Sequence, residues 1–363
     1  MKVRYRDLSV SDPKIKSELL GAVEKVLTHG QILLGPEVKE FEKLIAKECG
    51  TKHAVGVGCG TDALYLSMRA LGIGPGDEVI TTPLSWIATV NAIVAIGAKP
   101  VFVDIGSDLN IDPDLIQNSI NNKTKAIIPV HFTGRLCKMN KIMQVAKKNK
   151  LFVIEDAAQA YGANINGKMA GSFGDTGCFS MNAMKVYSSY GEAGAIAVNN
   201  DKLKDDLVSL RYNGTINKEN CHVPSINARI DTIHAAMMNI NAKYLSKRIK
   251  RIREISKYYN EKLKDIVDCP LEDNSFHTYY SYTIKIDDRD LFMDYLNQNE
   301  IETKIQHPIL MPFHTAYKKL YHSIYIPIAV KLVKKILCIP NHDKMTDQQV
   351  EHVVEKVCSY YKK

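Results

Sequence analysis

The chain has 363 residues, of which 45% are hydrophobic and 24% are charged, and its 48 lysines and arginines outnumber its 40 aspartates and glutamates. This composition excludes a disordered chain, a collagen and a coiled-coil rod, and the length suits two domains. No apolar run reaches the roughly 18–20 residues that a membrane span needs, and the first residues lack the apolar core of a secretory signal. We therefore expect a cytoplasmic protein.

Short apolar runs alternate with helical patterns over the first two hundred residues. Several runs consist almost entirely of Val, Ile, Phe and Ala, which is typical of strands covered on both faces. Alternation at these lengths predicts right-handed βαβ units and a parallel sheet. The predicted strands are 53–58, 78–82, 100–104, 126–131, 151–156, 177–181 and 195–198, and the predicted helices are 61–73 (capped by Thr61), 86–98, 112–120, 138–150 and 201–213.

The pattern changes near residue 230, where residues 228–266 predict a long helix. Ile249, Ile252 and Ile255 recur at spacings of three, so one face of this helix is apolar. Basic residues are concentrated between 247 and 253 and indicate a solvated face. The alternative is a positive rim that attracts an anionic substrate.

The last part of the chain predicts a small α+β domain. Its signals are a strand over 279–286 and helices over 290–299 and 347–361. We therefore divide the chain into a large domain over 1–240 and a smaller C-terminal domain over 241–363.

The eight cysteines indicate free thiols, many of them buried. None forms a CxxC pair or has a histidine at zinc spacing, so we expect no metal site. The positive charge does not indicate nucleic acid, because the basic helix lacks interleaved aromatic residues and carries no recognisable module. The cysteines are Cys49, Cys59, Cys137, Cys178, Cys221, Cys269, Cys338 and Cys358.

Residues 56–64 (GVGCGTDAL) form a turn between a predicted strand and a predicted helix. The free N–H groups at a helix N-terminus suit a phosphate. Ala63 stands where a dinucleotide fingerprint has its third glycine, and no Gly-Lys-Ser/Thr sequence follows. A simple strand–helix turn is the alternative interpretation.

A second motif, EDAAQA, ends the predicted strand 151–156. Open α/β sheets bind ligands at the carboxyl ends of their strands, so Asp156 and Gln159 are expected to face such a crevice. The alternative is that Asp156 caps the next helix.

The third motif, over residues 177–198, contains Ser180, Asn182 and Lys185. Lys185 lies among Met, Ala and Val residues, and desolvation in such surroundings frees a lysine amine as a nucleophile. A lysine able to form a Schiff base, with an aspartate to pair a pyridinium nitrogen, is the arrangement that binds pyridoxal phosphate.

These motifs together resemble the DegT/StrS-type nucleotide-sugar aminotransferases, which are fold-type I pyridoxal phosphate enzymes. The resemblance covers essentially the whole chain and implies a mostly parallel seven-stranded sheet with helices on both faces, plus a smaller C-terminal α+β domain. The motifs are GTDAL, SWIAT, EDAAQA, CFSMNAMK with GEAGA, LLGPEVKEFEK, PVFVDI, PVHFTG, LRYNG, INARIDTIHAA and IQHPILMPFHTAY.

The resemblance also implies roles for individual residues. Lys185 bonds the cofactor and later moves the proton between cofactor and substrate, and Asp156 keeps the pyridine nitrogen protonated. Gln159 hydrogen bonds to the 3-hydroxyl of the ring. Trp86, the one tryptophan, stacks on the ring, with a core aromatic as the alternative. The phosphate is expected at Gly60, at the amides of Thr61 and Asp62, at Ser180, and at Asn227 of the partner subunit, so that a homodimer shares its sites.

Substrate contacts are expected at Tyr187, Arg211, Tyr212, Arg229 and His307. The two arginines suit the glutamate carboxylate or a diphosphate, and ordinary ion pairs are the alternative. His307 suits the sugar, or else has a structural role in the turn before Pro308.

The motifs around residues 210–214, 226–230 and 305–309 most resemble enzymes that aminate C3 of a dTDP-linked 3-keto-6-deoxyhexose, with L-glutamate as donor and pyridoxamine 5'-phosphate as the intermediate cofactor form. One alternative is a C4 aminotransferase acting on a UDP- or GDP-linked 4-keto-6-deoxy sugar. A more distant one is a non-catalytic sugar-binding or regulatory homologue. Lys185 argues against the related dehydratases, which carry histidine at this position.

Overall fold

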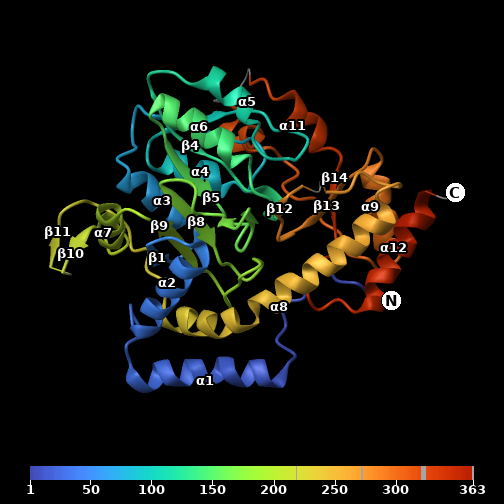
Figure 1. Ribbon diagram of the computed structural model, residues 1–363, viewed down its shortest axis with the longest axis horizontal. Helices are drawn as coiled ribbons and strands as arrows, with labels where there is room; N and C mark the ends of the chain where they lie inside the picture. Colours follow the sequence, from blue (N-terminus) through green and yellow to red (C-terminus); the bar gives the residue numbers. More distant parts are fainter. Residues whose placement is uncertain (218, 271–272, 320–323, 362–363) are drawn as a thin grey trace.

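A seven-stranded sheet forms the centre of the computed structural model, which describes residues 1–217, 219–270, 273–319 and 324–361 (Figure 1). Within this sheet β9 alone runs antiparallel to its neighbours. The prediction of a mostly parallel sheet is confirmed, and all seven predicted strands belong to it. In spatial order they are β1 (His53–Val57), β9 (Gly194–Val198), β8 (Thr176–Ser180), β5 (Phe152–Asp156), β4 (Thr124–Ile128), β2 (Glu78–Thr81) and β3 (Lys99–Phe102).

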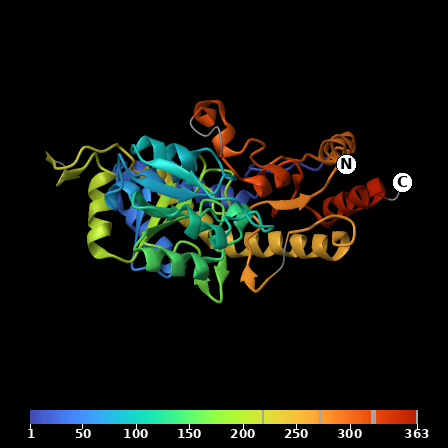
Figure 2. The same cartoon turned by 90° about the horizontal axis from the view of Figure 1, so that it is seen from above.

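Helices cover both faces of the sheet (Figures 1 and 2). In β9, Ala195 and Ala197 join one buried cluster while Ile196 and Val198 join another, so alternate residues face opposite helical layers. This two-sided burial explains why the strands are continuous apolar runs. One layer contains α2 (Pro36–Cys49), α6 (Met139–Asn149) and α8 (Thr232–Leu263), and the other contains α3 (Gly60–Ala70), α4 (Ala88–Ala95) and α7 (Asp201–Leu210).

The chain begins with a helix that the sequence patterns did not predict. This helix, α1 (Pro13–His29), lies along the N-terminal half of α8 (Figure 1), where Glu18 accepts a hydrogen bond from the hydroxyl of Tyr244 at 3.0 Å. The helix α2 was not predicted either. At α3 the predicted cap Thr61 is wrong, because the Sγ atom of Cys59 accepts the Asp62 amide at 3.4 Å and the helix begins one residue earlier.

A third buried cluster forms the C-terminal α+β unit. It joins the second half of α8, through Ile252, Ile255 and Tyr259, to the strand pair and the helices that follow. The unit contains β13 (Tyr282–Lys285), β14 (Ile336–Ile339), α9 (Arg289–Gln298) and α12 (Asp347–Tyr361).

The structure differs from the predicted division at residue 240 in two ways. The 32-residue helix α8 runs through that position without a break. Val3 is fully buried in the C-terminal cluster and bridges to Ile301, so the first residues pack with the C-terminal unit. The chain therefore starts within the small unit and runs from there to α1.

The two units also meet through the segment 275–281. The amide of Thr278 donates to the Gly134 carbonyl at 3.2 Å, and that of Ser281 donates to the Thr133 carbonyl at 3.3 Å. Gly134 has a φ of 95°, and a Cβ there would lie 2.8 Å from the Tyr280 nitrogen, so glycine permits this close approach.

The remaining elements are short. The hairpin of β10 and β11 projects away from the rest of the chain (Figures 1 and 2). Among the described residues, no helix is both long and apolar enough for a bilayer crossing. All eight cysteines are free, as predicted. The short elements are α5 (Pro113–Ile116), η1 (Gln117–Ser119), η2 (Phe132–Gly134), β6 (Asn164–Ile165), β7 (Lys168–Met169), β10 (Thr215–Ile216), β11 (Asn220–Cys221), β12 (Ser275–Phe276), η3 (Met311–Phe313), α10 (Thr315–Lys318) and α11 (Pro327–Leu332).

Candidate active site

A cavity of about 700 Å³ opens at the carboxyl ends of β5 and β8. Because these two strands are parallel neighbours, their last residues reach the same edge of the sheet. The C-terminal unit closes the opposite side with residues 304–309 and with Tyr280 and His314. The predicted site residues that line the cavity are Gly60, Thr61, Trp86, Asp156, Gln159, Ser180, Lys185 and His307.

One end of the cavity is formed by the N-terminus of α3. A Cβ on Gly60 would lie 2.7 Å from the Cβ of Ser180, so only a glycine lets this turn pack against the end of β8. The first N–H groups of a helix have no intrahelical partner and favour anions. The amides of Asp62 and Thr61 both donate to the Cys59 thiol, which leaves the Gly60 amide and the Ser180 hydroxyl as the better phosphate donors.

Asp156 lies in the floor of the cavity and is 4% exposed. Its Oδ2 accepts a hydrogen bond from the Thr89 hydroxyl at 2.8 Å, and its Oδ1 accepts one from the Ala158 amide at 3.2 Å. Burial raises the pKa of Asp156, although those two hydrogen bonds and the positive charge of Lys185 act to lower it. A positively charged ligand nitrogen at this carboxylate would therefore stabilise its ionised form.

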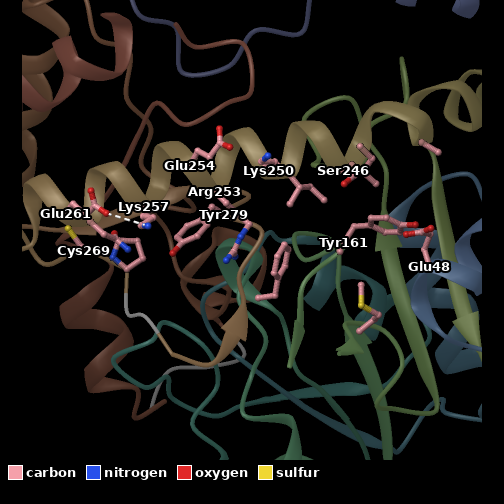
Figure 3. A pocket seen from close by; sticks show the side chains of 18 of the residues that line it. Glu48, Tyr161, Ser246, Lys250, Arg253, Glu254, Lys257, Glu261, Cys269 and Tyr279 are labelled. Carbon is pink, nitrogen blue, oxygen red and sulfur yellow. Dashed lines mark ion pairs between the residues drawn. The ribbon is translucent and has the colours of Figure 1, made fainter. Parts of the chain in front are cut away.

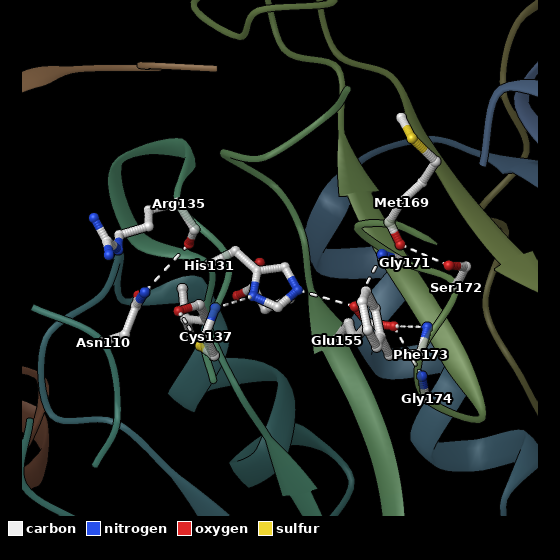
Figure 4. A network of polar contacts seen from close by, with 12 residues as sticks. Asn110, His131, Arg135, Cys137, Glu155, Met169, Gly171, Ser172, Phe173 and Gly174 are labelled. Carbon is white, nitrogen blue, oxygen red and sulfur yellow. Dashed lines mark hydrogen bonds and ion pairs between the residues drawn. The ribbon is translucent and has the colours of Figure 1, made fainter. Parts of the chain in front are cut away.

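A fully buried network fixes the backbone next to Asp156 (Figure 4). Glu155 accepts hydrogen bonds from the amides of Gly171, Phe173 and Gly174 at 2.7–2.9 Å. His131 accepts the Cys137 amide on Nδ1 at 3.2 Å, so its proton is on Nε2, which donates to Glu155 at 2.9 Å. The His131 amide in turn donates to the Asp156 carbonyl at 3.1 Å.

Gln159 is held from the side opposite to the cavity. Its Oε1 accepts the Thr133 amide at 2.9 Å. A side-chain amide that uses its oxygen in this way presents its nitrogen, a donor, to a ligand oxygen. This orientation suits the predicted contact with a ring hydroxyl.

The amine of Lys185 lies in the same cavity, with its Nζ 4.8 Å from the centre of the Tyr280 ring. Four residues that line the cavity are not among the predicted site residues: Tyr280, Thr89, Lys304 and Gln306. Tyr280 was placed in a predicted strand, and no local motif distinguishes it from the other tyrosines of that stretch.

Trp86 and His307 form the rim of the cavity. Their ring centres lie 5.7 Å apart, and Trp86 is 60% exposed, so the alternative of a core aromatic is excluded. Burial, together with the charges of Lys185 and Lys304, lowers the pKa of His307 to about 3. A neutral imidazole therefore faces the ligand near pH 7.

Two of the expected substrate residues lie elsewhere, and these expectations are corrected. Tyr187 is fully buried against Tyr161 and donates its hydroxyl proton to the Met238 carbonyl at 2.9 Å. Arg211 is buried too and binds Glu42 at 2.5 Å and the Gly56 carbonyl at 2.8 Å. The hydroxyl of Tyr187 and the guanidinium of Arg211 therefore both have partners within the fold. For Arg211, the alternative of an ordinary ion pair is the one that the structure supports.

Asn227, Arg229 and Tyr212 form a cluster outside the cavity of their own chain. The Arg229 Nε donates to the Asn227 Oδ1 at 2.7 Å, and the guanidinium lies 4.4 Å from the centre of the Tyr212 ring. Arg229 also bridges to Val57 at the end of β1, next to the turn that leads into α3.

A larger cavity of about 1250 Å³ follows α8 (Figure 3). Its lining mixes Lys250, Arg253 and Lys257 with Glu254 and Glu261, and it contains none of the predicted site residues. Other basic residues of the helix pair with acids, as Arg251 does with Asp347 at 2.6 Å. The basic stretch thus lies away from the candidate active site, contrary to the alternative of a substrate-attracting rim.

A lysine amine and a buried aspartate that share one cavity with a helix N-terminus define an aminotransferase-type site on this fold. The chain matches the model of the DegT/DnrJ/EryC1/StrS aminotransferase family over residues 13–358, and it belongs to this family.

Relatives and solved structures support this assignment over nearly the full chain. A dTDP-3-amino-3,6-dideoxy-alpha-D-galactopyranose transaminase of Aneurinibacillus thermoaerophilus is 38% identical, covering 99% of each chain. A protein of Geobacillus stearothermophilus named pleiotropic regulatory protein is 36% identical (100% and 99% covered), and a UDP-2-acetamido-2-deoxy-3-oxo-D-glucuronate aminotransferase of Pseudomonas aeruginosa is 32% identical (94% and 95%). The crystal structure of NtdA from Bacillus subtilis, with bound cofactor PMP, superposes with a TM-score of 0.94 at 29% identity, covering 100% of this chain and 86% of that one.

The raised pKa of Asp156 predicts that Asp156→Asn changes stability in a pH-dependent way. A carboxyl group whose pKa is raised on folding costs nothing below its unfolded pKa of about 4 and destabilises the fold as the pH rises through its folded value. We expect the cofactor-free variant to exceed wild type in unfolding free energy by about 1–3 kcal/mol near pH 8 and by almost nothing near pH 4.

Urea denaturation at both pH values measures this difference. Asp294→Asn, at an exposed position of α9, is the control and is expected to change neither value. A gain of equal size at both pH values would contradict the assigned cause.

Proposed function

We propose that this chain is a pyridoxal-phosphate-dependent aminotransferase that moves the amino group of L-glutamate to C3 of a dTDP-linked 3-keto-6-deoxyhexose. The observation that carries the enzyme class is the shared cavity of Lys185 and Asp156 beside the N-terminus of α3. The match to an aminotransferase family over residues 13–358 supports the same enzyme class independently of the cavity.

The residues of the cavity fit pyridoxal 5'-phosphate. The cofactor supplies an electron-accepting ring and an aldehyde that carries the amino group, as pyridoxamine 5'-phosphate, between two half-reactions. Asp156 offers a buried carboxylate to the ring nitrogen, Gln159 a donor to the ring hydroxyl, and Gly60 with Ser180 a close-packed cradle for the phosphate. Trp86 lines the same cavity and would cover one face of the ring.

Lys185 performs the proton transfers. Its Nζ would be the nucleophile that holds the aldehyde carbon of the cofactor. When an incoming amine takes its place, the freed amine would accept the proton of the substrate carbon and deliver it to the cofactor carbon. Asp156 would pair its charge with the ring nitrogen, and the neutral His307 lines the cavity on the side of the C-terminal unit. The same residues act in the reverse order with the ketosugar.

The choice of sugar rests on the motifs and on the relatives. The 38% identical relative is named for a dTDP-linked 3-amino sugar, and the Pseudomonas aeruginosa relative is named for a UDP-linked 3-oxo sugar. Both names concern C3, which favours C3 over the alternative of C4 on a UDP- or GDP-linked 4-keto sugar. The nucleotide is the less constrained part of the proposal.

We further propose a homodimer in which Asn227 completes the site of the partner subunit. The support is that Asn227, Arg229 and Tyr212 form a polar cluster near the turn before α3 but do not line the cavity of their own chain. Exposed Leu33 and Ile226 offer apolar surface to a second copy.

Lys185→Ala is expected to abolish covalent attachment of the cofactor and to lower turnover by about a thousandfold or more, because the nucleophile and proton carrier is lost. Borohydride reduction, followed by peptide mass spectrometry, locates the pyridoxyl group in wild type. Lys304→Ala, which removes another lysine of the same cavity, is the control and is expected to keep the adduct on Lys185. Normal transamination by Lys185→Ala would refute the enzyme class.

The substrate is tested with a panel of purified nucleotide-linked ketosugars, with glutamate as donor and products identified by NMR. We expect amination at C3, with kcat/KM for the dTDP-linked 3-keto sugar about tenfold or more above the UDP-linked 3-keto and the 4-keto sugars. Preference for a UDP-linked 3-keto sugar would overturn the nucleotide alone. Amination at C4 would overturn the position, and a cofactor adduct without any turnover would favour a regulatory homologue.

Shared sites are tested by mixing two inactive variants, Lys185→Ala and Asn227→Asp, under conditions in which subunits exchange. The aspartate keeps the contact with Arg229 but repels a phosphate. If Asn227 serves the partner's site, each mixed dimer keeps one intact site, and about a quarter of the wild-type activity returns. If Asn227 served its own chain's site, no mixed dimer would contain an intact site and activity would not return.

A further inference from the structure

Tyr280 lies beside the proposed catalytic lysine. It belongs to the segment that joins the C-terminal unit to residues 133–134, and it is 7% exposed. The Nζ of Lys185 lies over its ring, 4.8 Å from the ring centre. A cation in this position is attracted by the negative face of the aromatic ring.

A second cation contacts the same ring. The guanidinium carbon of Arg6 lies 5.1 Å from the ring centre, and Arg6 also donates a hydrogen bond to the Tyr280 carbonyl. Burial raises the pKa of Tyr280, but the charges of Lys185, Arg6 and Lys304 and a hydrogen bond with Gln306 outweigh burial, so the pKa is lowered overall. Two cations, one of them the amine of Lys185, therefore lie against the same buried ring.

The backbone of Tyr280 is held from three sides. Arg6 binds its carbonyl, the neighbouring Ser281 amide donates to Thr133, and Gly134 approaches its nitrogen so closely that a Cβ would lie at 2.8 Å. The ring is thus a fixed surface, whereas Lys185 is a long side chain in a loop between β8 and β9. Without such a contact, the side chain of an unattached lysine would be distributed over many rotamers, and only some of them place the amine in the cavity.

We propose that Tyr280 is a positioning residue for Lys185, and that its ring face holds the ammonium group whenever the amine is not bonded to the cofactor. The contact keeps the proton carrier inside the cavity that Asp156 and Gln159 line. This inference rests on the proposed function for its catalytic consequence, but the contact itself concerns two side chains of this chain. The same cavity is lined by the carboxylates of Asp156 and Glu192, of which Asp156 attracts the ammonium, and by Lys304, His307 and His314, of which His307 is neutral near pH 7.

The first test measures the contact without turnover. In the full chain freed of cofactor, the rate at which an amine-reactive reagent modifies Lys185 is followed against pH by peptide mass spectrometry. Tyr280→Met removes the ring but fills its space with a flexible side chain, and we expect it to move the midpoint for Lys185 roughly half to one pH unit lower, because the ammonium form loses its partner. Tyr280→Phe keeps the ring and is expected to match wild type.

The second test measures the consequence for the reaction. In single turnovers with glutamate, Tyr280→Met is expected to slow amine transfer about tenfold and to enlarge the isotope effect with C2-deuterated glutamate, since proton removal becomes the slow step. Tyr280→Phe is expected to restore both values. A loss of structure alone would weaken cofactor binding without enlarging the isotope effect.

Tyr279→Leu is the matched control. Tyr279 is equally buried in the same segment, but it stacks on His277 at 3.9 Å and lines the larger cavity along α8 (Figure 3). Its substitution is expected to leave the Lys185 midpoint and the isotope effect unchanged. Unchanged values in Tyr280→Met, or equal changes in Tyr279→Leu, would overturn the inference, while a shifted midpoint in a chain that transfers no amine from glutamate would overturn the proposed function alone.

Discussion

Two consecutive buried carboxylates at the end of β5 set the conditions for the rest of the site. Side chains alternate across a strand, so Glu155 and Asp156 face opposite sides of the sheet. A buried charge without partners is costly, and Glu155 is balanced by three backbone amides and by His131. Asp156 has weaker support from Thr89 and Ala158, and its charge is the one that a bound pyridinium would complete. The fold thus satisfies one carboxylate and leaves the other for the cofactor.

The same strand end explains how much of the site the sequence could predict. Gly60, Asp156, Gln159, Ser180 and Lys185 all follow strands of one mostly parallel sheet, and parallel strands bring their carboxyl ends to one edge. The apolar runs that predict the strands therefore also predict the grouping. The helix α1 was missed although its ends carry ordinary signals, since Asp12 caps the amides of Lys14 and Ile15, Pro13 opens the helix and Gly30 ends it.

The contacts that the sequence did not predict are those made by tertiary packing between distant segments. Tyr280 reaches Lys185 because the chain returns from the C-terminal unit past Gly134, a path that no local pattern encodes. Tyr187 and Arg211 were predicted to bind substrate because both lie near a motif. The sequence around a polar side chain does not reveal whether its hydrogen-bond partner is a ligand or another part of the protein. The structure supplies internal partners for both, at the Met238 carbonyl and at Glu42.

Thr133 links the two units to the cofactor cavity. Its φ of 60° is unfavourable for a β-branched residue, and such a conformation persists only where the surroundings fix it. Here its amide holds Gln159, while its carbonyl accepts the Ser281 amide and the His277 ring at 3.0 Å. The backbone of one strained residue therefore joins Gln159, the proposed cofactor contact, to the segment that carries Tyr280. Because Gln159 and the segment of Tyr280 both bind the backbone of Thr133, we expect a movement of the C-terminal unit to displace the proposed ring donor and the proposed support of Lys185 together.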